Sequence, residues 1–454
     1  MDTKALRQKI LDLAIHGKLV PQDPNDEPAS VLLERIRAEK ERLIKEGKIK
    51  KGKKSAKTSD KPHYPFELPK GWVWCKLDDI AYVGTGATPL TACKYYYENG
   101  NIAWINSSST KVPFIAKASN FITQKAIEET NCLVYPKGTL VIAMYGEGKT
   151  RGQISELLID AATNQACAAV RPYSEATKKY LKLFFEGNYL HIRALAEGGN
   201  QQNLSVGKIQ NYEIPLPPLD EQKRILDKAK ELLLQIDNIE VGKSVCQKYI
   251  NQAKSKVLDL AIHGKLVSQD PNDEPASELL KRINPKAEIT CDTPQYGKLP
   301  KGWCETTLGN TIVIKSGDAI KVRDNRIGKY PIYGGNGITG YNESYNVDGI
   351  NIIIGRVGFY CGSVHYVNNK IWVTDNAFVT KIMGNVYTPK FLYYLLQQYD
   401  LKQYSNSTAQ PVISGKTVYP INVMLPPLSE QYRIVARIEE LFAQLDKIES
   451  SLQA

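Results

Sequence analysis

The sequence predicts an α+β chain in which two α/β domains are separated by two long antiparallel helical arms that pack as a coiled coil. Three repeated markers lead to this prediction. Segment 11–30 returns at 258–277 with one difference, Pro21 against Ser268. The sequence LPKGW occurs at 68–72 and 299–303, and LPPL-x-EQ occurs at 216–222 and 425–431. Two stretches of domain size lie between these last two markers, so the chain reads as a duplication with pseudo-twofold symmetry.

The order of the repeated pieces is circular. Each copy runs from LPKGW through a variable stretch to LPPL, a helical segment and then LDLAIHGKLV, but the second copy ends after its helical segment. The piece that it lacks stands at the N-terminus. A solenoid has units of roughly 20–50 residues, which is far shorter than this repeat. Duplicated domains are therefore the better interpretation.

Apolar residues recur at helical spacing after both LPPL segments. The first run, from Asp220 to His263, predicts a near-continuous helix of about 44 residues, with Gly242 as a point where it can break. Asp220 and Ser429 are good N-caps for the two helices. The C-terminus repeats the first half of this run and the N-terminus repeats the second half. One continuous helix and one assembled from both chain ends would bury every apolar stripe, while two unrelated helical hairpins are the alternative.

The markers divide the chain into six predicted segments. These are an N-terminal helical segment at 1–46, a basic linker at 47–67, an α/β domain at 68–218, a central helical spacer at 219–298, a second α/β domain at 299–427 and a C-terminal helix at 428–454. The two domains retain faint correspondences at an offset of 211 residues: 163–166 (TNQA) matches 374–377 (TDNA), and 137–138 (KG) matches 348–349 (DG). We therefore expect one fold with two divergent surfaces.

Composition favours a nucleic-acid partner. The net charge is +11 and the sequence pI is about 9.0, which favours binding to phosphate. Part of this charge is a lysine run at 48–57, which is either a solvated linker or an arm that contacts phosphate. The sequence has no apolar run of the roughly 18 residues that a membrane span needs and no signal-peptide core at its start. Eight cysteines without a Cys-x-x-Cys spacing further suggest a cytoplasmic protein with reduced thiols.

Taken together, the markers resemble the specificity subunit of type I DNA restriction-modification enzymes. The resemblance rests on the paired LPKGW openings, the exits PLPPLDEQKRI and MLPPLSEQYRI, the segment QQNLS at 201–205 and the LDLAIHGKLV repeat, and it covers essentially the whole chain. It implies that both α/β domains are target-recognition domains, each reading half of a bipartite DNA site. It also implies that the helices dock two modification (methyltransferase) subunits, which restriction subunits can join. S-adenosylmethionine is then expected in the methyltransferase subunits, and no cofactor is expected in this chain.

Polar and basic loops beside predicted strands are the candidates for contacting DNA. In the first domain they are Asn106, Ser107, Ser108, Ser109, Lys111, Tyr145, Lys149, Thr150, Arg151, Gln201, Gln202 and Asn203; in the second they are Lys321, Arg323, Arg326, Tyr333, Asn336, Arg356, Tyr360 and Gln410. Arg151 and Arg356 are favoured, because each lies in a loop with glycines after a strand and arginine pairs bidentately with guanine. For each candidate, an ordinary solvated loop residue is the alternative.

Catalytic functions are disfavoured by the motifs that the sequence lacks. Segments 140–150 and 414–417 resemble phosphate-binding loops, but Ala143 and Gln410 stand where the first glycine is required. The Asn/Asp-Pro-Pro-aromatic sequence of amino-methyltransferases is absent, and five scattered histidines predict no metal site. His16 and His263 share one repeat position, which indicates a structural role. The remaining alternative is a coiled-coil scaffold that binds partner proteins without base-specific DNA readout, which leaves two loop-rich domains unexplained.

Overall fold

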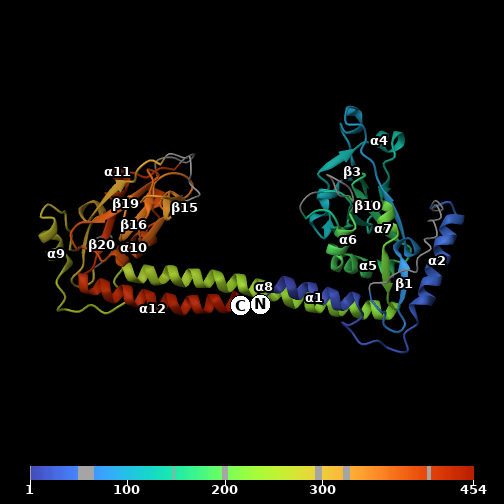
Figure 1. Cartoon of the computed structure of the whole chain (residues 1–454), viewed down its shortest axis with the longest axis horizontal. Helices are drawn as coiled ribbons and strands as arrows, with labels where there is room; N and C mark the ends of the chain where they lie inside the picture. Colours follow the sequence, from blue (N-terminus) through green and yellow to red (C-terminus); the bar gives the residue numbers. More distant parts are fainter. Residues whose placement is uncertain are drawn as a thin grey trace. The chain divides into compact units, whose positions relative to one another are not determined.

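The computed structural model describes residues 2–49, 66–146, 149–196, 203–291, 299–320, 328–405 and 411–453 (Figure 1). The chain forms two compact units, Asp2–Val241 and Gly242–Ala454. The boundary between them falls inside one continuous helix, α8 (Leu219–Ile262), which Gly242 does not interrupt. Each unit therefore contains one copy of the repeat, which opens with a helix ending in LDLAI and closes with a helix that follows LPPL.

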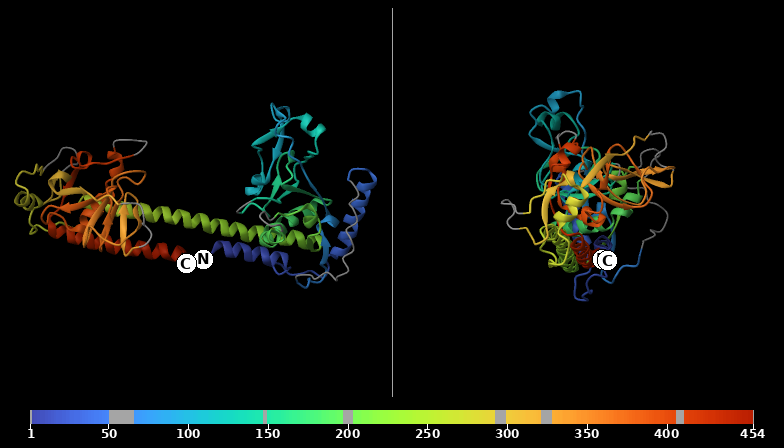
Figure 2. Two further views of the ribbon diagram at one scale, coloured as in Figure 1. Left: turned by 45° about the horizontal axis from the view of Figure 1, so that its top comes forward. Right: turned by 90° about the vertical axis from the view of Figure 1, so that its left-hand side faces the viewer.

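The pair of helices that supports each domain is called its arm below. The arm of the first unit consists of α1 (Thr3–Ile15) and the first part of α8, which lie side by side in Figure 1 and Figure 2. Near the start of α1, Arg7 forms ion pairs with Asp237 and Glu240. Beyond the end of α1, the Gln22 amide donates to Glu221 at the start of α8 (3.1 Å). The two helices therefore run antiparallel, as the sequence predicts.

The arm of the second unit repeats this arrangement with the last part of α8 and α12 (Leu428–Gln453). Lys254 pairs with Asp446 (2.7 Å) and Glu449 (3.1 Å), and the Gln269 amide donates to Glu430 (3.1 Å). Lys254 stands at the repeat position of Arg7. The predicted coiled-coil arms are thus confirmed, with the same ion pairs in both copies.

Both helices that follow LPPL begin earlier than expected. The first residues of α8 and α12 are Leu219 and Leu428, so Asp220 and Ser429 lie in the first turn and are not the N-caps. Asp220 instead forms an ion pair with Lys223 (2.8 Å). The preceding proline in each copy has no backbone N–H to satisfy, which permits the earlier start.

The first domain contains three sheets. Their strand orders are β1-β11, β2-β10-β7-β8-β4 and β5-β3-β9-β6. The strands are β1 (Val73–Lys76), β2 (Ala81–Thr85), β3 (Ile102–Ile105), β4 (Phe114–Ile115), β5 (Asn120–Ile122), β6 (Val134–Tyr135), β7 (Leu140–Ala143), β8 (Ile154–Leu157), β9 (Ala161–Thr163), β10 (Cys167–Pro172) and β11 (Glu213–Leu216). The helices of this unit, besides α1 and α8, are α2 (Ala29–Lys45), α3 (Leu77–Ile80), η1 (Lys94–Tyr96), η2 (Ser107–Lys111), α4 (Gln124–Glu129), α5 (Glu175–Gly187), α6 (Tyr189–Ala194) and α7 (Val206–Gln210).

The second domain is built on the same plan. Its strand orders are β12-β20, β13-β19-β16-β17 and β15-β14-β18. The strands are β12 (Cys304–Thr307), β13 (Ile312–Ser316), β14 (Tyr330–Gly334), β15 (Gly337–Asn342), β16 (Ile350–Gly355), β17 (Val364–Asn368), β18 (Trp372–Val373), β19 (Ala377–Ile382) and β20 (Asn422–Leu425). The helices, besides α8 and α12, are α9 (Ala276–Ile283), η3 (Leu308–Asn310), α10 (Pro389–Gln398), η5 (Leu401–Tyr404) and α11 (Gly415–Val418).

The strand pairings align the two domains. The order β2-β10-β7-β8 corresponds to β13-β19-β16-β17, and the parallel pair β3-β9 corresponds to β14-β18. The N–H of Asn164 donates to Ile105 O and that of Thr374 to Tyr333 O, both at 2.9 Å, which makes Asn164 equivalent to Thr374. The offset here is 374 − 164 = 210, so the predicted alignment at 211 is wrong by one residue. The prediction that the two domains share one fold is confirmed.

Each unit has a main core that joins its domain to its arm. In the first unit, Ile10 of α1 and Ile225 of α8 belong to the same buried cluster as Leu140 of β7 and Tyr180 of α5. In the second unit, the buried cluster contains Leu258, Ile352, Phe391 and Ile434, from α8, β16, α10 and α12. Because one close-packed core spans domain and arm, each domain is mounted firmly on its own pair of helices.

Candidate nucleic-acid interface

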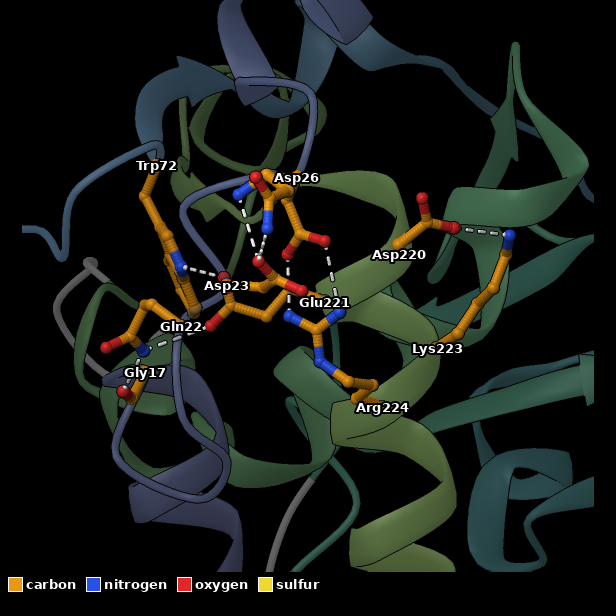
Figure 3. Close-up of polar contacts among 10 residues, drawn as sticks. Gly17, Gln22, Asp23, Asp26, Trp72, Asp220, Glu221, Lys223 and Arg224 are labelled. Atoms are coloured by element: carbon orange, nitrogen blue, oxygen red, sulfur yellow. Dashed lines mark hydrogen bonds and ion pairs between the residues drawn. The ribbon is translucent and has the colours of Figure 1, made fainter.

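A polar junction formed by the repeated markers attaches each domain to its arm, and Figure 3 shows the junction of the first unit. In the first unit, the Glu221 carboxylate accepts hydrogen bonds from the Trp72 indole N–H (3.0 Å) and the Gln22 amide (3.1 Å). Glu221 is only 1% exposed, and burial raises the pKa of its carboxyl. The three partners come from LPPL-x-EQ, LPKGW and the segment after LDLAIHGKLV, so each marker contributes one side chain.

The second unit contains the same junction. Glu430 accepts from the Trp303 indole N–H (3.0 Å) and from the Gln269 amide (3.1 Å), and burial again raises the pKa of the carboxyl. Beside each junction lies an ion pair, Arg224 with Asp26 (2.6 Å) and Arg433 with Asp273 (2.5 Å). The repeated residues therefore form the frame that holds each domain.

The histidines of the repeat belong to this frame as well. Nδ1 of His16 lies 2.6 Å from Asp12 O and Nδ1 of His263 lies 2.7 Å from Asp259 O, each histidine directly after the last residue of its helix. These contacts support the structural role that the sequence indicates. Among the described residues, no group of three or more His, Cys, Asp or Glu could hold a metal ion. Nor is any helix of that part long and apolar enough to cross a membrane.

The connection between β7 and β8, residues 144–152, is called loop L1 below. Its first residue, Met144, donates its N–H to Ala166 O (2.8 Å), and its last residue, Gly152, donates to Ala143 O (2.8 Å). Gly152 has a φ of +85°, a conformation that glycine adopts at no steric cost. Both ends of L1 are thereby fixed to the sheet.

The equivalent connection between β16 and β17, residues 356–362, is called loop L2. Arg356 donates its N–H to Asn376 O (2.9 Å), and Gly362, with a φ of +88°, donates to Gly355 O (2.8 Å). L1 and L2 therefore leave their sheets in the same way but differ in length and in sequence. Such a pair of loops is a suitable place for two different recognition surfaces.

The two favoured arginines occupy different positions in these loops. Arg356 is the first residue of L2 and is equivalent to Met144, whereas Arg151 precedes Gly152 and is equivalent to Cys361. Sequence alone suggested a common position, because both arginines follow a strand. Any contact that they make with DNA would therefore differ in geometry between the domains.

The Arg356 guanidinium already makes contacts within the second domain. Its guanidinium donates to Asp375 O (3.2 Å) and to Ser316 Oγ (3.4 Å), and it lies 5.4 Å from the centre of the Phe378 ring. The side chain is half-buried. These contacts brace L2 against the end of β18, so base reading by Arg356 would use the part of the guanidinium that remains outside.

L1 is supported by α6. The Tyr189 hydroxyl donates to Lys149 O (2.6 Å), and the Arg193 guanidinium donates to Arg151 O (3.3 Å). Thr150 and Arg151 are half-buried, while the Lys149 side chain is exposed. Lys149 and Lys111, which come from separate segments, line one pocket of about 320 Å³ beside η2. Glu186 lines the same pocket, so the two lysines share it with a carboxylate, and their contact with phosphate stays a prediction.

The other candidates of the first domain have mixed surroundings. Asn106 caps η2, and its side-chain oxygen already accepts from the Ser108 N–H (3.0 Å) and the Ser108 hydroxyl (2.6 Å). Ser107 and Ser109 are half-buried in the same turn, and Tyr145 is 37% exposed. Asn203 is half-buried at the start of the segment that leads to α7. The Asn106 carboxamide oxygen is therefore less available to a base than the sequence suggested.

In the second domain, Asn336 is exposed at the turn between β14 and β15, and Tyr360 of L2 is 50% exposed. Tyr333 is half-buried, with its ring 5.9 Å from that of His365, and burial raises the pKa of its phenol. Six further candidates lie outside the described residues, namely Gln201, Gln202, Lys321, Arg323, Arg326 and Gln410, as do the lysines at 50–57.

Sequence reasoning passed over the most exposed aromatic residue of L2. Phe359 is 73% exposed and adjoins Tyr360, with ring centres 5.0 Å apart. Its signal in the sequence was an aromatic pair between two glycines, Gly358 and Gly362, beside a candidate arginine.

The family of the chain follows from comparison with known proteins. Residues 69–244 and 300–454 match the family model of the type I restriction modification DNA specificity domain. Because these matches cover well over half of the sequence, the chain belongs to this family of DNA specificity subunits. The resemblance inferred from the markers is confirmed.

Two curated relatives align along almost the whole chain. The specificity subunit of the type I restriction enzyme EcoEI of Escherichia coli is 26% identical over 555 residues, covering 99% of this chain and 91% of that subunit. The EcoAI specificity subunit of the same species is 28% identical over 540 residues, covering 98% and 90%. A solved chain from a study of complex assembly and conformational transition of the type I R-M system has a TM-score of 0.60 and 18% identity, covering 86% of this chain and 94% of that chain. At that identity the likeness concerns the fold alone.

Proposed function

We propose that this chain reads a bipartite, asymmetric DNA site, one half with each of its two domains. The observation that carries this proposal is the contrast between frame and loops. The two junctions are identical down to their hydrogen bonds, whereas L1 and L2 differ in length and in the position of their arginines. A conserved mount with divergent loops is suited to two readers of different sequences, because base edges are read by side chains and phosphates by lysines and arginines.

The proposal includes docking of methyltransferase subunits on the arm. Support comes from two exposed apolar side chains on the part of α8 that belongs to the second unit, Val245 and Tyr249, which are 44% and 64% exposed. Their spacing of four residues places them on one helical face. Exposed apolar side chains on one face are unfavourable in water, and a helix of a partner subunit would bury them.

Catalysis in this scheme belongs to the partners. The methyltransferase subunits would bind S-adenosylmethionine and take the flipped adenine, while this chain selects the sequence. Restriction subunits would join the same complex. Acting on DNA with these partners places the chain in the cytoplasm.

The test is to map methylated adenines across the genome of a strain that carries this chain and its methyltransferase subunits. The expected result is methylation at one two-part sequence with unequal halves and a fixed spacer. A scaffold without base readout would instead leave the methylation pattern unchanged when the chain is deleted. Gel shifts with and without the methyltransferase subunits separate the two cases further, since a scaffold would give no sequence-specific shift.

A further inference from the structure

Loop L2 presents an aromatic side chain to solvent. Phe359 is 73% exposed, and no large hydrophobic side chain in the described part of the chain is more exposed. A phenylalanine side chain left in water forgoes the favourable free energy of burying its ring. A single exposed apolar residue is common on protein surfaces and does not by itself indicate a function. The residues around Phe359, however, indicate that its ring binds a partner.

The loop that carries Phe359 is rigid at its base. Gly358 donates its N–H to Pro411 O (2.9 Å), and Cys361 donates its N–H to Gly358 O (2.9 Å). The Cys361 side chain is 2% exposed and belongs to the core of the second unit. The Phe359 ring is therefore displayed by a fixed turn, which lowers the entropy lost when the ring binds a partner.

The ring also has a positive charge beside it. Lys402 of η5 places Nζ 4.3 Å from the centre of the Phe359 ring, within the range of a cation–π contact. The ring of Tyr360 meets that of Phe359 edge to face, with an interplanar angle of 83°. An apolar partner would have to desolvate the lysine. A nucleic-acid base next to its phosphate satisfies both groups at once, because the base stacks on the ring and the phosphate meets the ammonium.

We infer that Phe359 is a stacking site for a nucleotide base, inserted at a base step of the half-site read by the second domain. The inference rests on the proposed function, because it requires L2 to face DNA. Apolar wedges of this kind unstack a step and bend the duplex, which favours sequences that deform easily. L1 contains no phenylalanine, so the wedge would act on one half-site only.

The test compares Phe359→Ala, Phe359→Trp and a control, Tyr345→Ala, in the chain assembled with its methyltransferase subunits. Tyr345 is also an exposed aromatic residue of the second domain, at 41%, with Lys370 Nζ 4.6 Å from its ring centre, but it lies outside L2. The probe is a duplex with the mapped methylation sequence in which 2-aminopurine replaces one base at a time. We expect Phe359→Ala to weaken binding roughly 5- to 150-fold, which corresponds to about 1–3 kcal/mol per stacked base.

Fluorescence supplies the second readout. Wild type and Phe359→Trp should change the 2-aminopurine signal at one step of one half-site, and Phe359→Ala should abolish that change while Tyr345→Ala leaves it intact. If the wild-type complex discriminates its site but Phe359→Ala binds and fluoresces like wild type, the stacking role is wrong. An equal loss in Tyr345→Ala would also overturn it. If the wild-type complex does not prefer its site over a scrambled duplex, the proposed function itself fails.

Discussion

At the residue scale, each junction contains a buried glutamate, although removing a charged carboxylate from water is unfavourable. Glu221 has two donors, Trp72 and Gln22, for its two oxygens, so the charge is satisfied although it is shielded from water. Burial nevertheless outweighs those donors and raises the pKa of the carboxyl. Burial raises the pKa of the Glu430 carboxyl in the second junction as well, so we expect the stability of both junctions to change with pH in the same direction.

We expect that response to appear in the stability of the protein. A folded-state pKa above the ordinary glutamate value of 4.5 means that the native state holds protons that the unfolded state has lost. The protonated carboxyls therefore contribute to the free energy of unfolding. This stabilising contribution is complete at pH values below the pKa of glutamate in the unfolded chain, and it is lost as pH rises through the pKa in the folded protein. Thermal unfolding measured from about pH 4 to 8 should therefore show a smaller decline with pH for Glu221→Gln than for wild type. Parallel curves for the two proteins would contradict this account.

A second prediction at this scale separates sequence reading from phosphate binding in L1. The Arg151 guanidinium stands next to Gly152 at the end of the loop, while the Lys149 side chain is exposed at a pocket shared with Lys111. Arg151→Ala should cost about 1–3 kcal/mol on the cognate duplex and relax discrimination at one base position. Lys149→Ala should weaken all duplexes alike and lower the salt dependence by about one phosphate contact.

Titration of the assembled complex against cognate and single-mismatch duplexes at several salt concentrations measures both effects. Lys111→Ala is the matched comparison, because it should reproduce the behaviour of Lys149→Ala. Equal losses on every duplex for Arg151→Ala would assign that residue to phosphate binding.

The sequence could not predict how the two arginines differ. Their loops both follow a strand and contain glycines, but equivalence is decided by which N–H bonds which carbonyl across the sheet. Those bonds join residues far apart in the chain, such as Met144 with Ala166, and no local pattern reports them. The same limit explains why the sequence aligned Thr163, and not Asn164, with Thr374.

At the element scale, the helices were predictable because their periodicity is local. The 44 residues of α8 match the expected length, and the apolar stripe outweighs the cost of about 1 kcal/mol for a glycine within a helix. The start of each helix was placed one or two residues late. Asp and Ser usually cap helices, but the two prolines before α8 and α12 allow the helix to start at the leucine.

The turn after α1 offers a test of backbone geometry with a matched control. Gly17 has a φ of +64°, and a Cβ there would collide with the Pro69 ring and lie 3.0 Å from Trp72. Gly47 has a φ of +70°, but a Cβ there would meet nothing within 4 Å. Gly47→Ala should cost about 1–2 kcal/mol for the left-handed conformation alone, and Gly17→Ala should cost about 1–3 kcal/mol more for the collision. Chemical denaturation measures both, and equal losses would show that the junction can yield.

At the scale of the whole molecule, the repeated markers predict the architecture. They form the two junctions, with Trp72, Glu221 and Gln22 matched by Trp303, Glu430 and Gln269. The stretches that differ between the copies share a central strand order, to which the first domain adds β4 and β6. The sequence could not predict where L1 and L2 begin and end or how they attach to their sheets. These features depend on hydrogen bonds between residues that are distant in the chain.

This organisation predicts that the first domain can be exchanged as a module. The exchange replaces residues 68–218 with the stretch of another family member that opens with LPKGW and ends in LPP. It brings in a new L1, and the tryptophan at position 72 can still donate to Glu221. The second domain and α8 are untouched by the exchange. Genome-wide mapping of methylated adenines should then show one half-site changed, the other half-site preserved and the spacer unaltered. An exchange of only the Leu68–Trp72 marker should leave the whole site as it was. Because each domain has its own junction, the exchange leaves the second domain's contacts with its arm unchanged. A change in both half-sites would therefore mean that the two domains do not read DNA independently.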